Sequence, residues 1–286
     1  MKSLTIDSKI VKYPNELDPD VRVGLKTSGF DAPEVTLNSY GLPGADGLKV
    51  SGLWYDGRVI DVTGDVNAKD EATFIEYRQR VRGLVRASRS LIGVPSPKLV
   101  EFTTYSGESY FVYGFISKMN FITKNRYEGT FHFIITCEDY RIYGRDSFTT
   151  TPITRLTGGG FILPVVFPIV STEGVGGQVS VTNEGDTEVE PVIHIIGSAT
   201  NPYILNKNTG QYFQVNQVTG PGDHLIIDMK NKLILLNGTS ILNAKALGSS
   251  WFSLDPGQTF IGYSTGSTSD TGTMYLEGNP AFLGAS

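Results

Sequence analysis

Short runs of alternating hydrophobic and polar residues recur along most of the chain, and such alternation is typical of β-strands with one buried face. In the N-terminal half they include Leu48–Tyr55, Val59–Val66 and a series from Lys98 to Cys137. The Asp56–Gly57 pair between the first two runs predicts a hairpin turn, because this pair accepts the positive φ that such turns need. The later series predicts a meander of antiparallel strands with one face in the core.

One segment in this half has helical periodicity instead. From Asp70 to about Arg89, hydrophobic residues recur at spacings of three and four, which places them on one stripe of a helix. Asn67 or Asp70 can cap the start, and Glu71 suits the positive end of the helix dipole. We therefore expect an amphipathic helix over about residues 70–89 that lies across a sheet. Its apolar stripe comprises Phe74, Tyr77, Val81, Leu84 and Val85.

The C-terminal half shows no such helical pattern. Short strand candidates follow one another, separated by turns rich in Asn, Asp and Gly, and this spacing indicates a β-sandwich. The triplet Gly158–Gly160 favours a hinge, because it packs no side chain and costs entropy to order. The chain is thus expected to be mainly β, with a β-sandwich domain over 1–148 that carries the helix, a linker over 149–164 and a second β-sandwich domain over 165–286. The strand candidates of the second domain are Gln178–Val181, Glu188–Ile196, Phe213–Gln217, His224–Asp228, Lys232–Leu236, Ser250–Leu254, Gly257–Tyr263 and Gly272–Leu276.

Composition narrows the class of protein. Of the 286 residues, 40% are hydrophobic and 11% aromatic, which is enough for a packed core. The net charge of −5 disfavours nucleic-acid binding as the main function, since proteins that bind the phosphate backbone of nucleic acids are more often basic. No run approaches the roughly 18 apolar residues that span a bilayer, and the N-terminus lacks a signal-peptide pattern. We expect a soluble protein, made in a cytoplasm, with no membrane insertion.

Cysteine and histidine offer little catalytic chemistry. Cys137 is the only cysteine, so no intramolecular disulfide and no cysteine zinc cluster can form, and its apolar run predicts a buried, inert thiol. His132 and His194 lie within apolar strand runs, which favours satisfied core or edge imidazoles. His224 begins a strand after a turn, where a surface role is expected. No histidine spacing typical of a metal site accompanies them.

The acidic residues are the remaining candidates for catalysis. Asp186, Glu188 and Glu190 alternate along one predicted strand and share a face, which favours a solvated surface over a tuned acid–base pair. No nucleophile elbow, phosphate loop or dinucleotide fingerprint occurs in a suitable context. We expect no enzyme activity, no cofactor and no metal, and a hydrolase that uses these carboxylates is the third of three hypotheses.

Arginine is concentrated on the predicted helix, whose exposed face would be basic. Three interpretations are open for this face: a solvated surface supported by pairs such as Glu76–Arg80, a contact with an acidic neighbouring subunit, or a contact with DNA. No aromatic residues interleave with the arginines as they do in single-strand binders. The arginines concerned are Arg78, Arg80, Arg82, Arg86 and Arg89.

An ordered set of turn and strand sequences in the C-terminal half resembles a known family. In order and spacing, over about Val165–Tyr275, the set is similar to the C-terminal domain of the distal tail protein family. These proteins occur in long-tailed, mostly siphovirus-like phages and prophages of Gram-positive bacteria. The segments that carry the resemblance are Asn183–Asp186, Pro191–Ile193, Ile196–Gly197, Thr200–Tyr203, Thr209–Gly210, Gly222–Asp223, Leu225–Asp228, Asn237–Gly238, Ser250–Phe252 and Leu254–Gly257.

The resemblance implies a fold and an assembly. The second domain would be a galectin-like sandwich, and the first would be akin to the tail-tube fold. Copies of the chain would form a hexameric ring at the phage tail tip, closed by heterologous contacts between first domains. The ring would join the tail tube protein to baseplate or tip proteins and dock other tail proteins, and DNA would pass through it without specific binding. The protein would then belong to the virion.

Residues can be assigned to this hypothesis and to its alternative. The helix arginines named above, with strand edges of the first domain, are the expected ring interface. Tyr203, Trp251 and Phe252 are the expected partner or glycan surface, although Trp251 and Phe252 fall on opposite faces of their strand, so one of them fills the core. The alternative function is a carbohydrate-binding module that contacts the host cell wall. Lectin activity does not follow from the fold, because the sugar-binding residues of galectins cannot be mapped onto this sequence.

Overall fold

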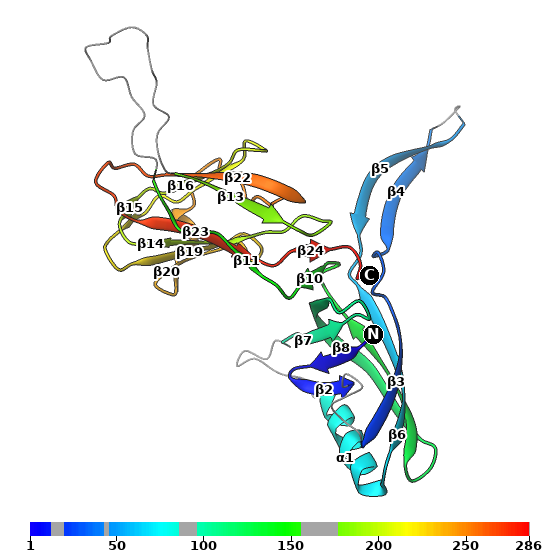
Figure 1. Cartoon of the computed structure of the whole chain (residues 1–286). Helices are drawn as coiled ribbons and strands as arrows, with labels where there is room; N and C mark the ends of the chain where they lie inside the picture. The colour runs from blue at the N-terminus through cyan, green and yellow to red at the C-terminus, as the bar shows by residue number, and fades with distance from the viewer. Residues whose placement is uncertain (13–19, 43–45, 86–95, 156–176, 286) are drawn as a thin grey trace, which may run out of the picture. The chain divides into compact units, whose positions relative to one another are not determined.

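The computed structural model describes residues 1–12, 20–42, 46–85, 96–155 and 177–285, and is mainly β with one α-helix among them. Contacts divide it into two compact units, Met1–Arg145 with Phe282–Ser286, and Asp146–Ala281 (Figure 1). The predicted fold class is therefore confirmed. No helix of the described residues is long and apolar enough to cross a bilayer.

The first unit is built on one large antiparallel sheet, with strand order β2-β1-β7-β8-β9-β6-β3. The meander expected after Lys98 is present, since β7, β8 and β9 are successive neighbours. The long strand β8 pairs first with β7 and then, past an irregularity between Ile116 and Lys118, with β9. The strands are β1 Ser3–Ile6, β2 Lys9–Lys12, β3 Val21–Ser28, β6 Val59–Ala68, β7 Lys98–Thr103, β8 Ser109–Thr123, β9 Glu128–Thr136 and the short β10 Ile142–Gly144, which pairs with β8.

The hairpin predicted across Asp56–Gly57 is wrong. Strand β5 (Leu48–Tyr55) pairs with β4 (Val35–Gly41), and the two form a separate ribbon. Strand β6 lies between β3 and β9, so neither of its edges is free to pair with β5. Gly57 serves a close backbone approach instead, because a Cβ there would lie 2.7 Å from the carbonyl oxygen of Cys137.

The amphipathic helix is confirmed as α1, Glu71–Arg82, followed by a 3₁₀ turn over Gly83–Val85. Asp70 caps it, accepting a hydrogen bond from the Thr73 N–H at 2.8 Å. Phe74, Tyr77 and Val81 are buried, as their spacing predicted, and pack in the same core cluster as the sheet. The last part of the predicted helix, beyond residue 85, lies outside the described residues.

The core of the second unit lies between two antiparallel sheets, and a separate two-stranded sheet is formed by residues 199–200 and 218–219. One sheet has the order β11-β23-β14-β19-β20-β21, with β12 also on β23, and the other has the order β13-β22-β16-β17. Alternate residues such as Ile193 and Ile195 of one sheet and Ile204 and Ile261 of the other are fully or almost fully buried, as in a sandwich.

The strands differ from expectation at several places. The strand predicted over Glu188–Ile196 begins only at Val192, and the strand Tyr203–Asn206 was not predicted. Residues 250–254, expected as a strand, contribute only an isolated bridge between Leu254 and Val189. Strands β11 and β12 pair with β23, although a linker was predicted over residues 149–164. The predicted hinge at Gly158–Gly160 lies outside the described residues and stays a prediction. The elements are β11 Phe148–Thr149, β12 Ile153–Thr154, β13 Gln178–Asn183, β14 Val192–Ile196, β15 Ala199–Thr200, β16 Tyr203–Asn206, β17 Tyr212–Gln214, β18 Val218–Thr219, β19 His224–Asp228, β20 Leu233–Leu236, β21 Thr239–Ser240, the 3₁₀ turn Leu242–Ala244, β22 Gly257–Ser264 and β23 Thr273–Gly278. The last strand, β24 Ala281–Phe282, pairs with β10 and belongs to the large sheet.

Candidate assembly surfaces

The β4–β5 ribbon exposes hydrophobic side chains on both of its faces. Val35 opposes Tyr55 and Leu37 opposes Leu53, which makes an apolar stripe on one face. Trp54 lies on the other face and is 48% exposed. In Figure 1 the ribbon projects beyond the large sheet of the first unit. The large hydrophobic residues of the two strands that stand exposed are Val35, Leu37, Tyr40, Leu48, Val50, Leu53, Trp54 and Tyr55.

Such a ribbon is a strong candidate for an interface. An isolated two-stranded hairpin is at best marginally stable in water, and contiguous exposed apolar surface marks interaction sites. Tyr55 stacks on Tyr140 at 4.7 Å, which anchors the base of the ribbon, but Leu48 near its far end is 74% exposed. The sequence analysis missed this surface. The consecutive apolar residues 53–55 were a signal for it, because they leave neither face of the strand polar.

The arginines expected at the ring interface have different surroundings. Arg78 is half-buried, and its Nη1 donates to Thr123 Oγ1 at 3.4 Å. The guanidinium of Arg80 lies 5.0 Å from the centre of the Tyr77 ring, in a cation–π geometry. Arg82 is exposed, whereas Arg86 and Arg89 lie outside the described residues. Arg78 and Arg80 thus contact their own unit, and the ring interface stays a prediction that rests most on Arg82.

The expected partner or glycan surface loses one member. Phe252 is 2% exposed and fills the core, so it cannot contact a partner or a sugar in this fold. Trp251 is half-buried and packs on Phe213, with 4.5 Å between ring centres. Tyr203, also half-buried, stacks on Tyr212 at 5.2 Å. A contact through Tyr203 and Trp251 stays a prediction.

Two histidines meet on the outward face of the sheet in the second unit. Nδ1 of His194 lies 3.0 Å from Nε2 of His224, and its Nε2 lies 3.0 Å from Oε1 of Glu277. The His194 ring also stacks on Tyr275 at 4.7 Å. Burial and the neighbouring His194 lower the pKa of His224. His194 is the satisfied imidazole that its sequence context predicted, but nothing in the sequence showed that the two histidines would meet.

The other candidates for chemistry match their expected surroundings. Cys137 is 1% exposed, and burial raises the pKa of its thiol to about 11, so the thiolate is scarce near neutral pH. Asp186 and Glu188 are exposed, and Glu188 accepts a hydrogen bond from Ser253 at 2.9 Å. Among the residues that the structure describes, no group of three His, Cys, Asp or Glu side chains could hold a metal ion.

Comparison with known families bears on the second unit. Residues 184–278 match the family model of the siphovirus-type tail component, C-terminal domain. This segment belongs to that family. The tail component domain covers most of the second unit, and it confirms the resemblance to phage distal tail proteins that the order of the turns indicated.

Comparison with solved structures extends the likeness to the whole chain. The Dit protein of phage SPP1, described as a paradigm of the hub adsorption apparatus in Gram-positive infecting phages, superposes with a TM-score of 0.66 at 16% identity. The match covers 97% of this chain and 98% of that chain, so this chain shares the fold of that protein. The activated baseplate of phage P2 with Ca matches with a TM-score of 0.49 at 9% identity, over 96% of this chain and 97% of that chain. No curated protein sequence matches the chain.

Proposed function

We propose that this chain is a structural hub subunit of the tail tip, whose copies close into a hexameric ring that joins the tail tube to baseplate or tip proteins. The observation that carries the proposal is the tail component domain over residues 184–278, found in a chain whose fold is shared along its length with a hub protein. The mechanism is geometric, because a heterologous interface that closes on itself leaves no open end for filament growth.

The β4–β5 ribbon supplies the ring contact. In this arrangement the ribbon of one copy lies on the first unit of the next copy and covers the apolar stripe that is exposed in one chain alone. Burying each half-exposed side chain contributes on the order of 1 kcal/mol, so the side chains of the apolar stripe together contribute several kcal/mol to holding copies together. Exposed Arg82 adds a charged contact beside this apolar one.

Light scattering with matched variants tests the ring. Leu53 in the ribbon is 59% exposed and Leu247 in the second unit is 100% exposed, so either can become Glu without opening a core. The wild type and Leu247→Glu should have a mass of about 187 kDa, six times the 31.1 kDa of one chain, and Leu53→Glu should fall toward one chain. The same mass for all three proteins would exclude the ribbon as the contact, and a wild type that stays monomeric at about 100 µM would exclude the ring.

A further inference from the structure

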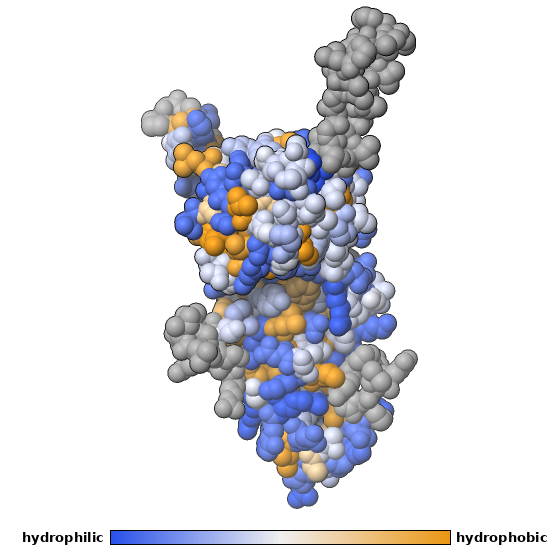
Figure 2. Space-filling view, turned by 90° about the vertical axis from the view of Figure 1, so that its left-hand side faces the viewer, coloured by the Kyte–Doolittle hydropathy of each residue, from blue (hydrophilic) through white to orange (hydrophobic). Residues whose placement is uncertain are grey.

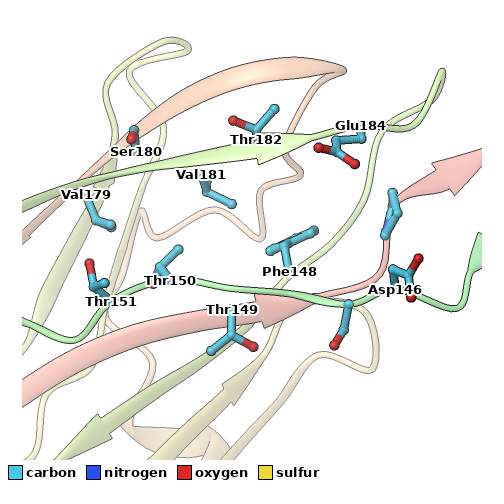
Figure 3. A pocket seen from close by; sticks show the side chains of 12 residues that line it. Asp146, Phe148, Thr149, Thr150, Thr151, Val179, Ser180, Val181, Thr182 and Glu184 are labelled. Atoms are coloured by element: carbon cyan, nitrogen blue, oxygen red, sulfur yellow. The ribbon is translucent and has the colours of Figure 1, made fainter.

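A groove runs along the open side of the sandwich in the second unit, between the edge strands of its two sheets. Strand β13 is the edge of one sheet and β11 is the edge of the other. The groove has a volume of about 580 Å³ and is lined by residues 146–151, by residues 179–182 of β13, and by Glu184 and Pro280. Figure 3 shows Phe148 pointing toward β13 from the opposite wall.

The backbone of β13 faces this side with unused hydrogen-bonding groups. Gly177 accepts a hydrogen bond from the N–H of Tyr263 at 2.6 Å, which fixes the odd-numbered residues as the ones bonded to β22. The N–H and C=O groups of Ser180 and Thr182 therefore point away from β22. None of the described residues pairs with these four groups, so the edge presents a template for a further strand.

Within the described residues, β13 also lacks the sequence features by which proteins normally protect an exposed strand. Lysine, proline and bulges are the usual means of blocking edge-to-edge pairing. The six residues Gln178–Asn183 contain no charged residue and no proline, and they pair with β22 in continuous register. The opposite edge is different, because β11 has two residues and Pro152 follows soon after. A strand of ordinary length can therefore be added at β13 but not at β11.

The charge of the groove indicates what kind of segment it suits. Asp146 and Glu184 lie at the same end, as Figure 3 shows, and no basic residue is among those that line the groove. The rest of the lining consists mainly of Ser, Thr and small apolar residues, with the Phe148 ring at the centre. An occupant with a cationic residue at the acidic end and small side chains facing inward is complementary to it.

We propose that the β13 edge binds an extended segment of another polypeptide as an added strand. The backbone of this segment pairs with Ser180 and Thr182, its inward side chains fill the groove over Phe148, and a Lys or Arg lies against Asp146 and Glu184. The site would hold a second protein independently of ring closure, since it lies wholly within the second unit.

A peptide display library of random sequences of about 12 residues, selected on the intact protein, tests the proposal. Ser180→Pro removes one outward N–H without touching the β22 ladder, and Ser180→Thr keeps that N–H as the matched control. Selected peptides should alternate small or apolar residues and carry Lys or Arg near one end. They should bind the wild type and Ser180→Thr alike, lose binding to Ser180→Pro, and bind the Asp146→Lys, Glu184→Lys double variant about tenfold more weakly.

Hydrogen exchange on the complex locates the bound peptide. Protection should appear at Ser180 and Thr182 when the peptide is bound, and thermal unfolding checks that each variant is folded. The proposal is overturned if the library yields no binder, or if the selected peptides bind folded Ser180→Pro as well as the wild type. It is also overturned if the β13 edges of two copies pair with each other, which would appear as a lower mass of the Ser180→Pro protein in the absence of peptide.

Discussion

Arg58 joins distant parts of the first unit through main-chain carbonyls, and its removal is a sharp test of how that unit is held together. The side chain is 3% exposed. Its Nε donates to the Tyr140 carbonyl at 2.9 Å, its Nη1 donates to the carbonyls of Gly29 and Asp31, both at 2.6 Å, and its Nη2 donates to that of Leu283. Burial lowers the pKa of Arg58, but a guanidinium stays protonated in proteins.

Arg58→Met keeps most of the side-chain volume and removes every donor. The four carbonyls that lose their partner cost about 1 kcal/mol each, so the first unit should lose about 4 kcal/mol of its free energy of unfolding. That is a large part of the roughly 5–15 kcal/mol that stabilises a typical domain. Arg126→Met is the matched control, because Arg126 is exposed in the turn between β8 and β9 and should change the stability by less than about 0.5 kcal/mol.

The assay has to resolve the two units, because a single unfolding curve does not describe a protein with two units. Pulsed hydrogen exchange at increasing guanidinium concentration, read by mass spectrometry on separate peptides, gives an unfolding midpoint for each unit. Arg58→Met should lower the midpoint for peptides of β6 and β9 and leave those of β14 and β19 unchanged. A first unit within 1 kcal/mol of the wild type would refute the assigned role of Arg58.

Three further predictions concern side chains inside the two units. Gly64→Ala should destabilise the first unit by about 1–3 kcal/mol in urea unfolding, because the added Cβ would lie 2.2 Å from the buried Phe131 ring. An unchanged unfolding midpoint would contradict this packing. The pKa of His224 is lower in the folded protein than its ordinary value of 6.5, so the second unit should lose stability as the pH falls from 6.5 through that lower value. The unfolding midpoints at pH 7.5 and pH 5 should therefore differ less in His224→Asn than in the wild type. An equal difference in the two proteins would exclude His224 as a cause. Cys137 should react with Ellman's reagent at least about 100-fold more slowly in the native protein than in guanidinium, and comparable rates would show that the thiol is accessible.

Local patterns were the parts of this structure that the sequence predicted well. The stripe of Phe74, Tyr77 and Val81 depends only on the spacing within one helix, and Asp70 caps that helix through its immediate neighbours. The strand runs were found for the same reason. Pairing was harder, because the Asp56–Gly57 turn favoured a local hairpin while β6 found both of its partners far along the chain.

The candidate surfaces depend on information that the sequence does not hold. Hydrophobic residues such as Leu37 and Leu53 look like core residues until the fold shows that the described residues leave more than half of each side chain exposed. Arg58 gave no signal, since its partners are carbonyls of residues whose identity scarcely matters. The unprotected edge of β13 could be recognised only after the sheet order showed that it is an edge.

Negative-stain electron microscopy of the purified wild-type protein tests the ring most directly. The account predicts closed annular particles with sixfold symmetry and a central opening. Images that contain only single particles the size of one chain at micromolar concentration, or open helical filaments, would contradict it.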